Sequence, residues 1–506
     1  KKKKDSLKGL TTGGANVAVG FAALEANTTA SNNVAIGFTA LLSNTTGSFN
    51  VAVGKDALAA NTTAAQNTAV GGVSMASNTT GANNTALGTS SLNANTTGSS
   101  NTAVGTNALV VNTEGSNNTA VGMQSLDANT SGNNNTAVGY QSLSANITGG
   151  RNTAIGFGSL DANDAGFNTA VGYNSLGANT SAENNTAVGN ESLAANTTGA
   201  NNTVVGSAAL DANTTASNHV AVGYAALTSN TTGQRNTAVG ALSSQEITTG
   251  DDNVAMGYLS LGSTTTGIEN VAIGVEALQL NTTGDSNTAV GMRALEANTT
   301  AGSNTAVGVF ALGVNTTGTE NTAVGANALD ANTTASNNSA FGRMALSANT
   351  TGTNNTGLGH QALIGNTSGA ENVAVGKDAL ASNTTGGSNV AVGTRAMDAV
   401  TTGFNNTGLG HAAATNLTTG GDNTIIGSEA GEDLTTGGDN TALGRLAGQS
   451  LTTGSNNILL GRLAGRSGSP ETVSSASHRI VLGDDQIASF KCNVSLTATS
   501  DARDRP

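Results

Sequence analysis

The sequence repeats itself every 17 residues over almost its whole length, and this period restricts the possible folds more than any other feature. Each repeat carries an Asn-Thr-Ala-Val-Gly core and closes with Asn-Thr-Thr-Gly or a near variant. The glycine that ends the core recurs in register from Gly20 to Gly461, with one 16-residue step before Gly172. A short fixed period indicates a solenoid, in which each coil stacks only on its neighbours. We therefore predict an all-β fold, a parallel β-solenoid or β-roll that allows single helical turns.

Composition excludes several classes of protein. Charged residues make up 10% of the chain and aromatic residues 3%, so the polarity comes from Asn, Thr, Ser and Gly, which suit tight turns and stacked hydrogen bonds. The net charge of −13 argues against nucleic acid, which needs a basic stripe. No apolar run approaches the ~20 residues of a transmembrane helix, so we expect no membrane insertion. The single cysteine, Cys492, excludes an internal disulfide.

The segment Thr119-Ala120-Val121 represents the core of each repeat. Its alternation predicts a short strand. The alanine position stays small, and the next position is almost always Val, Ile or Leu. We predict that one face fills the coil and that the alanine face meets a neighbouring chain. The closing tetrad is turn chemistry, and it contains the 16-residue step, so we expect this corner to face solvent.

The middle arm of the repeat carries a leucine four residues after the glycine and an asparagine seven residues after it. In four repeats the large apolar group leaves the first position and appears at the second, as a packed interior permits. The two positions are therefore predicted to share one interior space, on a helical turn or a bent strand. The four exchanged pairs are Ser244 with Ile247, Ala414 with Leu417, Gly431 with Leu434, and Gly448 with Leu451.

The asparagines of the arm are then buried, and a stack of equivalent amides can satisfy itself from coil to coil. Each exchange for an apolar residue would interrupt that stack. The predicted structural ladder comprises Asn27, Asn44, Asn61, Asn95, Asn129 and Asn146, with Leu24, Leu41 and Leu58 beside them and the corner glycines Gly20, Gly37 and Gly54.

The thinness of one coil predicts association of several chains. Neighbouring strands lie ~4.8 Å apart, so one coil per repeat would give a solenoid about 130 Å long. A 17-residue coil encloses little volume, and small cross-sections bury too little apolar surface to be stable alone. Packing of several solenoids along their length would remedy this.

The end of the chain reads Ser500-Asp501-Ala502-Arg503 after a short apolar segment. This ending resembles the junction between bacteriophage tail fibres or tailspikes and a C-terminal intramolecular chaperone of the S74 peptidase family. The resemblance implies a chaperone that trimerises the fibre and then cuts itself off, with Ser500 as nucleophile and Ser500–Asp501 as the scissile bond. The family often has a lysine five residues after the serine as its base. Arg505 stands there instead, and arginine stays protonated.

The repeats, over roughly residues 13–465, are similar to the head repeats of trimeric autotransporter adhesins of the YadA type and to repeats in phage fibre proteins. The adhesin unit has 14 residues with an Asn-x-x-Ala-x-Gly core, so the coil here has a longer middle arm. The resemblance implies a homotrimeric fibre. We divide the chain into an N-terminal lead-in (1–12), a solenoid shaft (13–465), a β cap (466–500) and the start of a chaperone (501–506).

These features together lead us to expect the structural shaft of a bacteriophage tail fibre, located in the virion. Its expected partners are two further copies of itself, other tail or baseplate proteins, and a host cell-surface glycan or protein reached through the fibre tip. The alternative is the passenger rod of a trimeric adhesin on the bacterial cell surface. An ice-binding solenoid, which requires outward ranks of threonine such as Thr119, is a third possibility, although Val17, Val34 and Val51 interrupt the rank.

Sites for substrate chemistry are not expected from the sequence. No cofactor motif and no metal-binding motif is present, and self-cleavage at Ser500–Asp501 is the only reaction that we anticipate. The four histidines lie in different repeats and are interpreted as surface variation: His219, His360, His411 and His478.

Overall fold

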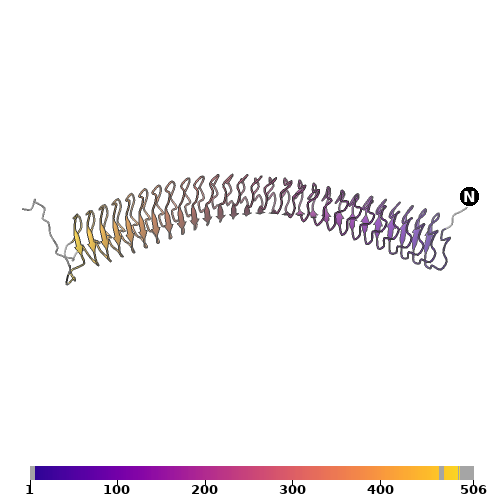
Figure 1. Cartoon of the computed structure of the whole chain (residues 1–506), viewed down its shortest axis with the longest axis horizontal. Helices are drawn as coiled ribbons and strands as arrows, with labels where there is room; N and C mark the ends of the chain where they lie inside the picture. Colours follow the sequence, from indigo (N-terminus) through magenta and orange to yellow (C-terminus); the bar gives the residue numbers. More distant parts are fainter. Residues whose placement is uncertain (1–5, 467–471, 488, 490–506) are drawn as a thin grey trace, which may run out of the picture. The chain divides into compact units, whose positions relative to one another are not determined.

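The computed structural model describes residues 6–466, 472–487 and 489 and divides into two compact units, Lys1–Thr300 and Ala301–Pro506. In the described part of both units every regular element is a three-residue β-strand, and no helix occurs. Within each unit the strands follow one another along the sequence, one strand per coil (Figure 1). The prediction of a parallel β-solenoid is thereby confirmed, whereas the single helical turns that the sequence allowed are absent from the described residues.

The first unit contains β1 (Val17–Val19), β2 (Val34–Ile36), β3 (Val51–Val53), β4 (Thr68–Val70), β5 (Thr85–Leu87), β6 (Thr102–Val104), β7 (Thr119–Val121), β8 (Thr136–Val138), β9 (Thr153–Ile155), β10 (Thr169–Val171), β11 (Thr186–Val188), β12 (Thr203–Val205), β13 (Val220–Val222), β14 (Thr237–Val239), β15 (Val254–Met256), β16 (Val271–Ile273) and β17 (Thr288–Val290). The second contains β18 (Thr305–Val307), β19 (Thr322–Val324), β20 (Ser339–Phe341), β21 (Thr356–Leu358), β22 (Val373–Val375), β23 (Val390–Val392), β24 (Thr407–Leu409), β25 (Thr424–Ile426), β26 (Thr441–Leu443), β27 (Ile458–Leu460) and β28 (Ile480–Leu482).

The strands pair in parallel, and equivalent residues of successive repeats stand side by side. Ala18 pairs with Ala35, and Ala35 with Ala52. The 16-residue step leaves this register intact, because Thr153 of β9 still pairs with Thr169 of β10. The residue is lost from the turn rather than from the sheet.

The inner face of each strand carries the small residue, which corrects the prediction of an alanine face that meets another chain. Ala120 is completely buried inside the coil, whereas Thr119 and Val121 lie on the outer face and are partly exposed. The coil is so narrow that a methyl group already meets the side chains of the arm. The outer face therefore carries the branched residues.

The packing of the C-terminal coils shows that the inner strand position and the leucine position share one space. Where the arm has Gly431, the strand carries Ile425, and a Cβ added to Gly431 would lie 3.1 Å from Cγ2 of Ile425. A Cβ on Gly448 would lie 2.8 Å from Cδ1 of Leu459 in the next coil. Interior volume is thus conserved across three positions rather than two, in agreement with close packing of protein interiors.

The middle arm is a turn in which right- and left-handed residues alternate. Leu24 has a φ of 54° and Leu41 a φ of 52°, and leucine rarely adopts this region because its Cβ crowds the carbonyl. Hydrogen bonds to the next coil hold the arm in place, since the Leu24 N–H donates to the Ala40 carbonyl (3.0 Å) and the Ala26 N–H to the Leu42 carbonyl (3.1 Å).

The corner after each strand requires glycine for two reasons. Gly20 has a φ of 135°, a conformation that L side chains disfavour. In addition, a Cβ on Gly20 would lie 2.3 Å from the carbonyl oxygen of Gly37 in the next coil. The close approach of successive corners explains why this glycine returns in every repeat.

Candidate functional site

The predicted asparagine stack lies inside the coil. We call it the arm ladder; it consists of Asn27, Asn44, Asn61 and their equivalents, all fully buried. Nδ2 of Asn61 donates to Oδ1 of Asn44 at 2.8 Å, and Nδ2 of Asn44 donates to Oδ1 of Asn27 at 3.3 Å. Leu24, Leu41 and Leu58 are likewise fully buried beside this ladder.

A second stack, which the sequence analysis missed, runs along the start of the strands. We call it the strand ladder; it consists of the residue directly before each strand, such as Asn67 and Asn84. Oδ1 of Asn67 accepts the Asn84 N–H at 2.9 Å. Asparagine precedes every strand from β1 to β27 except β13, and this regularity was the available signal.

The two ladders converge on one backbone acceptor in each coil. The Gly98 carbonyl accepts Nδ2 of Asn84 from the strand ladder and Nδ2 of Asn95 from the arm ladder, both at 2.9 Å. Buried amides need such partners, because an unsatisfied buried polar group costs about 1–3 kcal/mol. The interior of the coil is therefore a hydrogen-bonded lattice closed by leucine and alanine.

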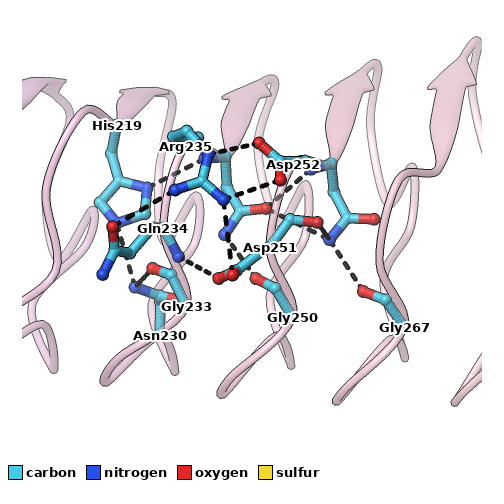
Figure 2. A network of polar contacts seen from close by, with 11 residues as sticks. His219, Asn230, Gly233, Gln234, Arg235, Gly250, Asp251, Asp252 and Gly267 are labelled. Atoms are coloured by element: carbon cyan, nitrogen blue, oxygen red, sulfur yellow. Dashed lines mark hydrogen bonds and ion pairs between the residues drawn. The ribbon is translucent and has the colours of Figure 1, made fainter.

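His219 takes the asparagine place before β13, so its interpretation as surface variation is wrong. Only 1% of the residue is exposed. Its Nδ1 accepts the Asn236 N–H at 3.2 Å, and its Nε2 lies 3.3 Å from Nδ2 of Asn230 (Figure 2). Burial lowers the pKa of His219 to about 4, so the ring is neutral at pH 7. His360, His411 and His478 are exposed, as expected.

Polar groups without a partner mark the places where the arm ladder is interrupted. Oδ1 of Asn230 and Oδ1 of Asn383 are buried and have no hydrogen-bond partner. In the next coil, Ile247 and Val400 stand where an asparagine would donate. At Ile247 the interruption that the sequence predicted is therefore visible as an unpaired oxygen, and Val400, which is not one of the four exchanged pairs, has the same effect on Asn383.

The single 16-residue coil is closed by a side chain that replaces a backbone carbonyl. In an ordinary coil, the Thr96 carbonyl accepts three successive N–H groups of the preceding coil, at 3.0–3.4 Å. In the short coil, Oδ1 of Asp164 accepts the N–H groups of Ile147, Thr148 and Gly149, at 2.8, 2.6 and 3.2 Å. Partial burial raises the pKa of Asp164, but these bonds outweigh it and the net shift is downward. Asp164 is exposed, so this corner faces solvent as predicted.

A groove of about 420 Å³ adjoins the short coil. Phe167 and Arg151 form one wall, with the Arg151 guanidinium carbon 5.0 Å from the centre of the Phe167 ring. Asn133, Thr148 and Glu183 contribute polar side chains. The groove lies beside the shortened turn that contains Asp164.

The outer face of the strands is left uncovered in both units. The third residue of each of the 28 described strands is Val, Ile, Leu, Met or Phe, and none of these residues is buried. Val19 is 58% exposed and Leu443 is 48% exposed. Aromatic rings also stack at the corner after the strand, with Phe157 between Tyr140 and Tyr173 at centroid distances of 5.3 and 5.5 Å.

The described residues contain neither a metal-binding cluster nor a membrane-spanning helix. Among the described residues no three His, Cys, Asp or Glu side chains are grouped so that they could hold a metal ion. None of these residues belongs to a helix that could span a bilayer. Ser500 and Asp501 lie outside the described residues, so the cleavage site predicted from the resemblance remains a prediction.

Comparisons with known proteins give no family for the chain. No protein-family model matches the sequence, and no curated protein matches it.

Proposed function

We propose that the chain is the structural shaft of a bacteriophage tail fibre, a homotrimer that holds host-receptor-binding elements away from the virion during adsorption. One observation carries the proposal: the outer face of both units presents an apolar side chain in every coil. Monomeric proteins rarely leave such long apolar patches in water. Identical chains placed side by side would cover them, since each coil offers the same side chain at the same height.

The hydrogen bonding inside the coil also supports a structural role. The interior polar groups bond to one another from coil to coil, which leaves few groups for catalysis. The Ser-Asp-x-Arg ending at Ser500 supplies the link to tail fibres by resemblance. In this proposal the partners are two further copies of the chain, other tail or baseplate proteins, and a host surface molecule at the tip.

The decisive experiment is the mass of the native assembly. The purified chain, of 49.2 kDa, is measured by native mass spectrometry beside a variant with V70E and V121E on the outer face. A control carries T46E and T97E, two exposed turn residues away from the strands. We expect a trimer for the parent and the control, and monomers for the outer-face variant. A monomeric parent at micromolar concentration would overturn the proposal.

An ice-binding solenoid is the second candidate that an observation favours, because the first residue of most strands is a threonine on the outer face, as at Thr119. Freezing-point measurements at millimolar protein decide it. Thermal hysteresis would favour ice binding, and simple colligative freezing would dismiss it.

A further inference from the structure

We propose that the groove beside the short coil binds a saccharide that carries a carboxylate. The groove lies between the turns that precede β8, β9, β10 and β11 and is lined by Asn133, Thr148, Arg151, Phe167 and Glu183. The assignment gives the shaft a lateral ligand of its own, and it rests on the groove and not on the trimer.

Arg151 is the side chain that would recognise the carboxylate. Its guanidinium carbon lies 5.0 Å from the centre of the Phe167 ring, and this cation–π contact uses none of its N–H groups as hydrogen-bond donors. Within the described residues no hydrogen bond or ion pair engages the Arg151 side chain. A carboxylate accepts two parallel N–H groups from such a fork.

Arg235 occupies the same coil position as Arg151, but in an ordinary 17-residue coil. It also directly precedes the asparagine of the strand ladder, but its Nε donates to Oδ1 of Asp252 at 2.6 Å and its Nη2 to Oδ2 at 2.8 Å (Figure 2). Oδ2 of Asp251 also lies 3.6 Å from Nη2 of Arg235. Arg235 is therefore already paired, whereas Arg151 is available.

The remaining walls of the groove suit a sugar. The exposed Glu183 carboxylate and the amide of Asn134 can bond to hydroxyl groups, and the apolar ring of Phe167 can pack against the C–H face of a pyranose. Asp164 is committed to backbone N–H groups. A polyphosphate, which concentrates several negative charges, suits the groove less than a single carboxylate, because the exposed Glu183 carboxylate lies in the same groove.

The test is a titration of the full chain with a galacturonate trisaccharide, followed by saturation-transfer NMR and calorimetry. The neutral galactose trisaccharide serves as the ligand control. We expect R151A to weaken binding at least about tenfold, which is the contribution of a hydrogen bond to a charged group. R235A is the matched control and should leave the affinity unchanged. Equal binding of both sugars, or equal loss in R151A and R235A, would overturn the proposal.

A second variant removes the groove without removing its side chains. Insertion of one threonine between Asn163 and Asp164 restores a 17-residue coil, and the repeat then closes as its neighbours do. We expect an unchanged circular dichroism spectrum and loss of saccharide binding. Binding that survives the insertion would contradict the assignment. Because binding and oligomeric state are measured separately, failure here leaves the proposed shaft untouched, and a monomeric shaft leaves this test valid.

Discussion

Asn230 and Ile247 occupy the same position in adjacent coils, and Oδ1 of Asn230 is left buried without a donor. The cause lies three residues before Ile247, where Ser244 replaces the usual leucine. Ile247 fills the volume that Ser244 vacates, and the arm ladder is broken as a result. Packing and hydrogen bonding thus compete for one side-chain position.

This competition predicts a strong coupling between the two residues. I247N alone should leave a cavity beside Ser244, and S244L alone should overfill the coil, each at a cost of about 1–3 kcal/mol. The double variant S244L/I247N restores the common pattern and gives Oδ1 of Asn230 a donor. We expect its unfolding temperature, measured by calorimetry, to exceed that of the parent. Additive losses would show that the positions do not share one space.

The buried imidazole of His219 predicts a dependence of stability on pH. Its pKa is about 4 in the folded chain and 6.5 in an ordinary environment. Between these values the unfolded chain binds a proton that the folded chain does not. The stability conferred by the neutral ring is therefore complete above pH 6.5 and falls as the pH is lowered towards 4, by up to about 1.4 kcal/mol per pH unit.

The matched variant is H219N, which places the common asparagine in the strand ladder. Unfolding temperatures are compared at pH 7, 6, 5.5 and 5, above the range in which most carboxylates titrate. The difference between parent and H219N should grow as the pH falls. A constant difference would mean that His219 is not held neutral by burial.

Two glycines on the inner face of strands should respond differently to alanine. A Cβ on Gly408 would lie 2.8 Å from Cγ of Met397, whereas the nearest atom to a Cβ on Gly357 would be the Ala362 carbonyl oxygen at 3.3 Å. We expect G408A to lower the free energy of unfolding by about 1–3 kcal/mol through overpacking, and G357A to be nearly neutral. M397L should rescue G408A. Thermal unfolding measures the stability of each variant. Equal losses in G408A and G357A would count against a shared interior space.

The strand ladder predicts a local loss of protection. In N118A the Asn135 N–H loses its acceptor, Oδ1 of Asn118, which lies 2.9 Å away. A buried donor without an acceptor costs about 1–3 kcal/mol. In a repeat protein each coil contacts only its neighbours, so this cost lowers the local stability of the adjacent coils. Hydrogen exchange at Asn135 should accelerate in N118A. N129A, in the arm ladder, leaves that bond intact and should have little effect on this amide.

The repeat made most of the fold predictable. The fixed position of Gly20 and its equivalents defined one coil, and the exchanged pair Ser244 and Ile247 located the interior of the arm through side-chain volume alone. A short repeat allows few conformations of the coil. Compensating changes of side-chain volume at two positions are then enough to place both positions in the interior.

The orientation of the strand was not predictable in the same way. Small and branched residues alternate in Thr119-Ala120-Val121 whichever face is inside. The choice depends on how near the arm approaches, which is visible only in pairs such as Ile425 with Gly431. Similarly, the left-handed leucines could not be foreseen, because leucine gives no sequence signal for a positive φ.

The strand ladder and the groove were harder to predict from the sequence than the core. The asparagine of the strand ladder was overlooked because it precedes the strand and looks like turn chemistry. The groove depends on Arg151 and Phe167, which come from consecutive coils, and on Asp164, which closes the shortened turn beside them.

Asp164 also has a consequence for how the length of a repeat can vary. Its carboxylate gives the coil of Ile147 the same three acceptor bonds that a backbone carbonyl gives elsewhere. The preceding coil therefore needs only an oxygen at this corner, whether it belongs to the backbone or to a side chain. A repeat of this kind can lose one residue at the corner, and the strands on either side still pair in register.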